Sequence, residues 1–125
     1  MRISKADCPE MIKETNPAQD GFYMPGEFER HQGCIMIWPE RPGSWRNGAR
    51  EAEAAFSAVI RAIAESETVY VAAEKKGIGH AKAFAQSLKE ENLYPVIVFE
   101  METDDSWARD VAPTFLVKNV NNNSI

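Results

Sequence analysis

The sequence predicts an α/β fold, in which apolar strands alternate with amphipathic helices. Three observations support this prediction: short apolar runs, two longer stretches with apolar residues at helical spacing, and the alternation of the two along the chain. The 125 residues are enough for one domain. Hydrophobic residues make up 44% and charged residues 26%, a balance typical of soluble globular proteins that excludes disordered and collagen-like chains.

The composition divides the chain into three parts. Residues 1–32 carry prolines and glycines among polar residues and are expected to form an irregular lead-in. Residues 33–118 hold the expected strands and helices and are expected to form an αβ unit. Residues 119–125 are a polar end that follows an expected strand without closing a core. We therefore expect a chain that is truncated at this end.

The first half of the αβ unit is expected to contain two strands and a helix. Residues 34–38 are a continuous apolar run closed by Pro39, which is typical of a buried strand. A helix over about residues 49–65 follows, with Asn47 as its N-cap, and a second buried strand covers residues 68–73. The apolar stripe expected on this helix consists of Ala52, Ala55, Phe56, Val59 and Ile63.

The second half repeats the alternation. A helix is expected over residues 78–91, a third strand over residues 94–99, where an early Pro95 is tolerated, and a fourth strand over residues 113–118. The order of strand, helix, strand, helix, strand, loop and strand predicts a sheet covered by helices. The apolar side of the second helix consists of Ile78, Ala81, Phe84, Ala85 and Leu88.

Charge and composition also exclude some classes of binding partner. The net charge of −5 argues against a nucleic-acid surface, which needs a basic footprint. The first residues have no apolar stretch of signal-peptide length, and no apolar run approaches the roughly 20 residues that span a bilayer. We therefore expect a cytoplasmic protein with neither a nucleic-acid nor a membrane partner. Cys8, Cys34, His31 and His80 show no metal-ligand spacing, so no metal is expected.

The densest polar cluster, residues 103–110, directly follows the third expected strand, where α/β proteins place ligand sites. Trp107 and Asp110 would lie on opposite faces of a strand but on one face of a helical turn. Asp104 or Asp105 could cap such a turn. The spacing therefore permits an indole and a carboxylate that face one spot.

Such a pair suits a guanidinium group, because a carboxylate accepts two parallel hydrogen bonds from it and an aromatic face attracts the cation. A structural interpretation stays open, in which Asp104, Asp105 and Asp110 cap and solvate a loop while Trp107 fills the end of the sheet. Arg109 could pair with a neighbouring carboxylate.

Other reactive side chains have ordinary structural interpretations. Trp38 ends a strand and is expected in the core, and His31 is expected at the surface or in a cap. Cys34 lies in an apolar strand and is expected to be a structural thiol. His80 lies on a helix with no partner in view, and the sequence assigns no role to Trp45.

Several segments resemble the agmatine deiminase family, within the guanidino-modifying enzymes. They are DGFYMPGEFERHQGC at residues 20–34, WPERP at residues 38–42 with Trp45 and Arg46 after it, and DDSWARDVAPTF at residues 104–115. The last resembles the family's block D-x-W-x-R-D-x-x-P-T-F. The resemblance runs from about residue 20 to residue 117, with the motifs in the family's order.

The resemblance implies the first blade, and a little more, of a five-bladed α/β-propeller. It implies hydrolysis of agmatine to N-carbamoylputrescine and ammonia, a step of putrescine and polyamine biosynthesis, through a covalent amidino-cysteine and without metal or organic cofactor. Asp110 maps onto the family's first guanidinium-binding carboxylate and Trp107 onto its aromatic neighbour. The nucleophilic cysteine, the histidine and the second aspartate are expected beyond Ile125, so the chain alone is expected to be inactive.

Three alternatives stay open at this point. The chain could belong to a deiminase for another guanidino substrate, arginine or peptidylarginine, whose specificity residues would also lie beyond Ile125. It could instead be a non-catalytic, truncated α/β remnant. The sequence also leaves open whether a full-length protein forms a homo-oligomer.

Overall fold

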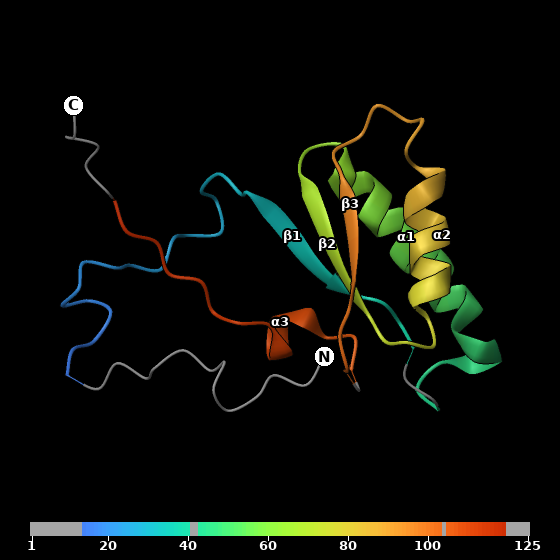
Figure 1. Cartoon of the computed structure of the whole chain (residues 1–125), viewed down its shortest axis with the longest axis horizontal. Coiled ribbons are helices and arrows are strands. Elements are labelled where there is room, and N and C mark those ends of the chain that lie inside the picture. The colour runs from blue at the N-terminus through green and yellow to red at the C-terminus, as the bar shows by residue number, and fades with distance from the viewer. Residues whose placement is uncertain (1–13, 41–42, 104, 120–125) are drawn as a thin grey trace. The chain divides into compact units, whose positions relative to one another are not determined.

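The computed structural model describes residues 14–40, 43–103 and 105–119. Residues 30–113 form one compact unit, and the described residues before and after them form another. The elements follow one another along the chain as shown in Figure 1. They are β1 (Gly33–Ile37), the 3₁₀ segment η2 (Arg46–Ala49), α1 (Arg50–Ala64), β2 (Thr68–Ala73), α2 (Ile78–Ser87), β3 (Val96–Glu100) and α3 (Ala108–Val111).

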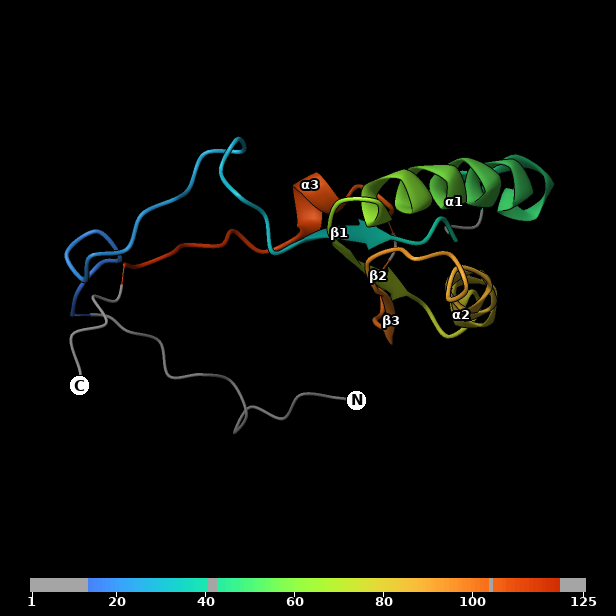
Figure 2. The same cartoon turned by 90° about the horizontal axis from the view of Figure 1, so that it is seen from above.

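The three strands form one parallel sheet in the order β1-β2-β3. Its register places Cys34 opposite Val69 and Val69 opposite Val96. Parallel neighbours need a crossover, and α1 and α2 supply the two crossovers in this sheet. Both helices lie on the same side of the sheet (Figure 2). The prediction of an α/β fold is confirmed.

The core lies between the sheet and these two helices. From the sheet, Val69, Val71 and Ala73 alternate along β2 and are at most 1% exposed. From the helices, Ile60 and Ala81 meet them and are equally buried. This alternation follows from the strand period of two, which sends every second side chain of β2 toward the helices.

The other face of the sheet carries apolar side chains that remain partly exposed. Tyr70 and Ile97 are paired neighbours on this face, with exposures of 38% and 43%, and Phe99 is exposed to 39%. The short helix α3 contacts β1 and lies near its carboxyl end (Figure 1). The strands are thus apolar on both faces, as predicted, although α1 and α2 cover only one of them.

The start of α1 differs from the prediction. Asn47 is not the N-cap, because the helix begins at Arg50 with Ala49 as its cap residue. Asn47 and Ala49 have positive φ of 53° and 67°. The side-chain amide of Asn47 donates to Glu51 Oε1 at 3.2 Å, whereas an N-cap side chain would accept from a backbone N–H of the helix. Together with Gly48, these left-handed residues move the cap from Asn47 to Ala49, two residues later than predicted.

The buried face of α1 is also displaced from the predicted stripe. Ala55 and Val59 are exposed, whereas the fully buried side chains are Ala52, Ile60 and Ala64. Val59 and Ile60 are both apolar, so the spacing alone cannot decide which of them faces the sheet. The buried positions follow a four-residue spacing, which aligns them along one ridge of the helix.

The second helix and the expected fourth strand also differ from the prediction. The second helix ends at Ser87 rather than at residue 91. At this end, the Ser87 hydroxyl donates to the Phe84 carbonyl at 2.7 Å. The expected fourth strand, residues 113–118, is not a strand. Its apolar residues pair with the lead-in at a single antiparallel bridge between Tyr23 and Val117, with two backbone hydrogen bonds of 2.9 Å. The described part of the lead-in, residues 14–32, otherwise has turns and no helix or strand, as expected.

Within the part of the chain that the structure covers, no helix is long and apolar enough to cross a membrane.

Candidate functional site

The residues predicted to form a guanidinium site lie on α3, a single helical turn. Trp107 is its N-cap residue, and Asp110 lies within it, with the Asp110 amide donating to the Trp107 carbonyl at 3.0 Å. Ala112 adopts an extended conformation with ψ of 153° and ends the turn, because Pro113 disfavours the α region for the residue before it. The predicted short turn is therefore present.

The predicted cap of this turn is wrong for Asp105 and lies outside the described residues for Asp104. The N-cap residue is Trp107, whose side chain makes no capping hydrogen bond. The Asp105 carboxylate instead accepts a hydrogen bond at 2.7 Å from the Ser106 amide, which lies before the N-cap residue Trp107 and outside the helix. Asp105 therefore shapes the loop before α3 rather than the helix itself.

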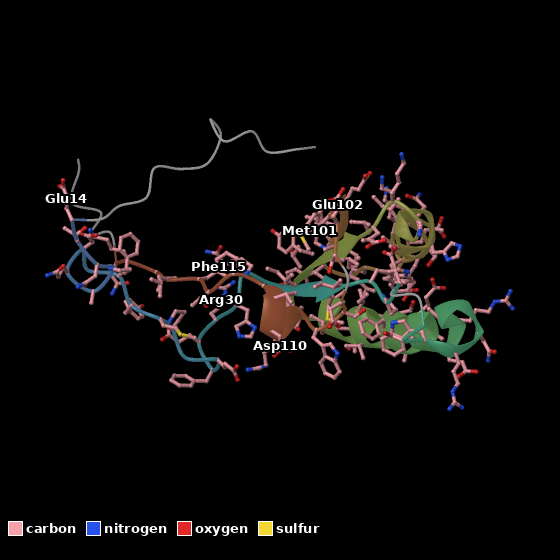
Figure 3. All side chains as sticks on the ribbon, turned by 90° about the horizontal axis from the view of Figure 1, so that it is seen from below. Glu14, Arg30, Met101, Glu102, Asp110 and Phe115 are labelled. Atoms are coloured by element: carbon pink, nitrogen blue, oxygen red, sulfur yellow. The ribbon has the colours of Figure 1, made fainter. Side chains whose placement is uncertain are left out.

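Trp107 and Asp110 are both accessible. The Trp107 residue is 69% exposed, so it does not fill the end of the sheet as the structural interpretation required. Asp110 and its neighbour Arg109 are also exposed. Figure 3 shows Asp110 on α3, with Glu102 and Met101 at the other end of the loop that follows β3. An exposed indole and an exposed carboxylate three residues apart could bind a planar cation.

The end of β1, next to α3, is held by a carboxylate clamp that the sequence did not reveal. Glu40 accepts a hydrogen bond from the Glu74 amide at 2.8 Å and another from the Gly77 amide at 2.9 Å. Burial raises the pKa of Glu40, and the two amide hydrogen bonds partly offset that effect. A side chain at Gly77 would collide with this carboxylate, since an ideal Cβ would lie 2.7 Å from Glu40 Oε2. In the sequence, the glycine at position 77, just before the helix, is the one feature that could have indicated this close approach of the Glu40 carboxylate.

Trp38 is a core residue, as predicted, and its indole joins both helices. The ring is 2% exposed and stacks on Phe84 of α2 at a centroid distance of 6.0 Å. Its Nε1 donates to Glu53 of α1 at 3.2 Å, and the same carboxylate oxygen lies 3.0 Å from His80 Nδ1. His80 therefore has a partner that sequence reasoning missed, because Glu53 is distant in the chain. Trp45 packs edge-on against Phe56 at 6.2 Å.

The remaining predicted residues keep structural roles. His31 pairs with Glu67 at 3.3 Å at the surface, as expected of a surface histidine. Cys34 is half-buried in β1; its pKa is raised by burial first and by the Glu67 charge second. A thiol with a raised pKa is a poor nucleophile at neutral pH, which fits the structural role predicted for Cys34. Among the described residues, no group of three or more histidine, cysteine or acidic side chains could hold a metal ion.

Several known proteins similar to this chain are named agmatine deiminases. The agmatine deiminases of Ectopseudomonas mendocina and Pseudomonas aeruginosa are each 45% identical to it over 103 residues, which are 82% of this chain and 26% of either relative. The solved agmatine deiminase of Enterococcus faecalis has a TM-score of 0.74 and 35% identity, covering 86% of this chain and 27% of that one. The chain thus spans about a quarter of the length of these relatives.

The family model for Porphyromonas-type peptidyl-arginine deiminase matches residues 23–124, which is most of the chain. That range includes the β1 end, both covering helices and α3 with its tryptophan and aspartate. The chain therefore belongs to the Porphyromonas-type peptidyl-arginine deiminase family.

Proposed function

We propose that this chain is the N-terminal part of an agmatine deiminase, which hydrolyses agmatine to N-carbamoylputrescine and ammonia in putrescine biosynthesis. One observation carries the proposal: α3 presents an accessible Trp107 and Asp110 three residues apart, in a chain whose 45% identical relatives are named agmatine deiminases. In this proposal the chain forms the first blade of a cytoplasmic α/β-propeller. The partly exposed sheet face around Tyr70 and Ile97 would then pack against a neighbouring blade.

The role of this chain in the reaction is to hold the guanidinium. The Asp110 carboxylate would accept two N–H bonds from it, and the Trp107 indole would lie against its delocalised charge. These contacts would present the guanidinium carbon to a thiolate, which adds there while ammonia leaves with a proton from a histidine. Water then attacks the amidino-cysteine, releasing the ureido product and the thiolate. The nucleophilic cysteine, the histidine and a second aspartate would come from parts of the full-length protein outside this chain.

A deiminase for arginine or peptidylarginine is the second candidate, because the matching family model carries that description. The guanidinium end of those substrates would be held in the same way. Free arginine also carries an α-carboxylate, which would need a basic partner. The agmatine deiminase names of relatives that are 37–46% identical favour a substrate without that carboxylate.

A ligand titration of the ¹⁵N-labelled chain tests the proposal. Agmatine and putrescine share a four-carbon chain and an ammonium, but only agmatine has a guanidinium. We expect agmatine to shift the Trp107 indole N–H and the Asp110 amide more than putrescine does. Binding should be weak, because an exposed ion pair contributes about 0.2–1 kcal/mol and an exposed cation–π contact about 0.5–1 kcal/mol.

The matched variants for this titration are Asp110→Asn and Asp105→Asn. Asp110→Asn removes the charge and one acceptor and should abolish the agmatine-specific shifts. Asp105→Asn keeps the oxygen that accepts from the Ser106 amide and should preserve them. Equal responses to agmatine and putrescine, or an agmatine response that survives in Asp110→Asn, would refute the proposed site.

A further inference from the structure

The loop that joins β3 to α3 is tied to the sheet at its first residue. The Met101 amide donates to the Ala73 carbonyl at 3.0 Å, which extends the pairing of β2 with β3 by one step. Figure 3 shows Met101 and Glu102 at this end of the loop and Asp110 at the other. The conformation of the residues in between therefore decides where Asp110 lies.

The side chain of Thr103 closes the middle of this loop. Its hydroxyl donates to the Asp105 carbonyl at 2.9 Å and accepts from the Asp105 amide at 3.3 Å. Both backbone groups of Asp105 are thus held by one side-chain oxygen. The Thr103 residue is half-buried, so this hydroxyl is only partly open to competition from water.

The hydrogen bonds continue from Asp105 to the start of α3. The Asp105 carboxylate accepts from the Ser106 amide at 2.7 Å, and the Ser106 carbonyl accepts from the Ala108 amide at 3.1 Å. Ala108 is the first residue of the helix that carries Asp110. An unbroken series of contacts therefore runs from the Thr103 hydroxyl to α3.

The helix α3 has little intrinsic stability. It is four residues long, and its N-cap residue Trp107 makes no capping hydrogen bond with its side chain. A single turn is unfavourable in isolation, because ordering its backbone costs more free energy than one hydrogen bond returns. The preceding loop therefore contributes to the order of α3, together with the contacts of the helix with β1.

We propose that Thr103 is a positioning residue, whose hydroxyl orients α3 and thereby sets the placement of Trp107 and Asp110. This inference rests on the proposed function of those two residues in holding a guanidinium. Small displacements of a group that holds a substrate lower the rate of a reaction strongly, so a loop hydroxyl can control the site without touching the ligand.

The test compares Thr103→Val with Thr103→Ser in the complete chain. Valine matches the shape of threonine but lacks the hydroxyl, whereas serine keeps it. Amide hydrogen exchange of Asp105, Ser106 and Asp110 reports the order of the loop and helix, independently of any ligand. Agmatine-induced shifts of the Asp110 amide report the site, and the urea midpoint reports the overall stability.

In Thr103→Val we expect exchange at these three amides to rise at least about tenfold, because the acceptor and donor that hold Asp105 are lost. The agmatine response should weaken, Thr103→Ser should restore both readouts, and the urea midpoint should stay near that of the unchanged chain. A merely structural role would lower the midpoint and raise exchange throughout the sheet.

Two results would overturn the inference. One is unchanged exchange at Ser106 and Asp110 in Thr103→Val. The other is an agmatine response that is present in the unchanged chain and equal in the valine and serine variants. Failure of the proposed function gives a different pattern. The unchanged chain would then show no agmatine-specific shift, while Thr103→Val would still loosen α3 and Thr103→Ser would restore it.

Discussion

Replacing Gly77, the cap residue before α2, with alanine should destabilise the fold. The backbone at Gly77 is right-handed, with φ of −100°, so the conformation itself accepts a side chain. The added Cβ would meet the Glu40 carboxylate, whose Oε2 would lie 2.7 Å away. Glu40 must then swing out and give up its hydrogen bonds to the Glu74 and Gly77 amides.

The magnitude follows from these two bonds. A hydrogen bond to a charged group contributes about 1.5–3 kcal/mol when buried, and the partial exposure of Glu40 lowers that figure, so we expect a combined loss of about 2 kcal/mol. Gly79→Ala is the matched control, because Gly79 lies inside α2 with nothing within 4 Å of an added Cβ. That substitution should stabilise the chain by about 0.5–1 kcal/mol.

Urea unfolding followed by tryptophan fluorescence measures both changes, and a double-mutant cycle with Glu40→Ala isolates the clash. With the Glu40 carboxylate removed, Gly77→Ala should cost less than about 0.5 kcal/mol, since the alanine meets no obstacle. Equal costs of Gly77→Ala in the two backgrounds, or a Gly77→Ala chain as stable as Gly79→Ala, would refute the reasoning.

Three further predictions concern the reactive groups. The chain alone should form no N-carbamoylputrescine from agmatine above a control without protein; product formation that disappears in Cys34→Ser would instead identify Cys34 as a nucleophile. In a Cys8→Ser background, Cys34 should react slowly with iodoacetamide at pH 7 and about tenfold faster per pH unit above it, because burial and the Glu67 charge raise its pKa, and Glu67→Gln should speed the reaction at fixed pH. The raised pKa of Glu40 means that the folded chain binds this proton more tightly than the unfolded chain, so the contribution of Glu40 to stability is lost as the pH rises through its folded pKa. The urea midpoint should therefore fall with rising pH relative to Glu40→Gln, and a difference independent of pH would contradict the assignment.

The sequence was sufficient for the fold class and for the elements whose patterns are unambiguous. The strand predicted at residues 68–73 is β2, because its apolar run is continuous and bounded by polar residues on both sides. The buried face of α1 could not be predicted, since Val59 and Ile60 are both apolar and only the sheet decides between them. Its start was missed because Ala49 adopts a left-handed conformation, which the sequence does not favour, and follows the left-handed Asn47.

The candidate site likewise has one part that the sequence predicts and surroundings that it does not. The turn that carries Trp107 and Asp110 follows from local rules, namely their three-residue spacing and a proline that ends the helix. Contacts elsewhere in the same unit join residues far apart in the chain. Glu40 reaches the Gly77 amide across 37 positions, and Glu53 reaches His80 across 27. Such pairings depend on the completed fold and leave no periodic signal in the sequence.

The central claim, that Asp110 holds a guanidinium for hydrolysis, is tested most directly by turnover in a chimera. Residues 23–119 of this chain would replace the matching segment of the Pseudomonas aeruginosa agmatine deiminase, which is 45% identical to the chain. We expect the chimera to release ammonia from agmatine, and Asp110→Asn to lower kcat/KM at least about 100-fold, since it removes roughly 3 kcal/mol of charge-assisted hydrogen bonding. Asp105→Asn, which keeps its acceptor for the Ser106 amide, should stay near the parent chimera. A folded chimera that hydrolyses no agmatine, or an Asp110→Asn variant as active as its parent, would contradict the account.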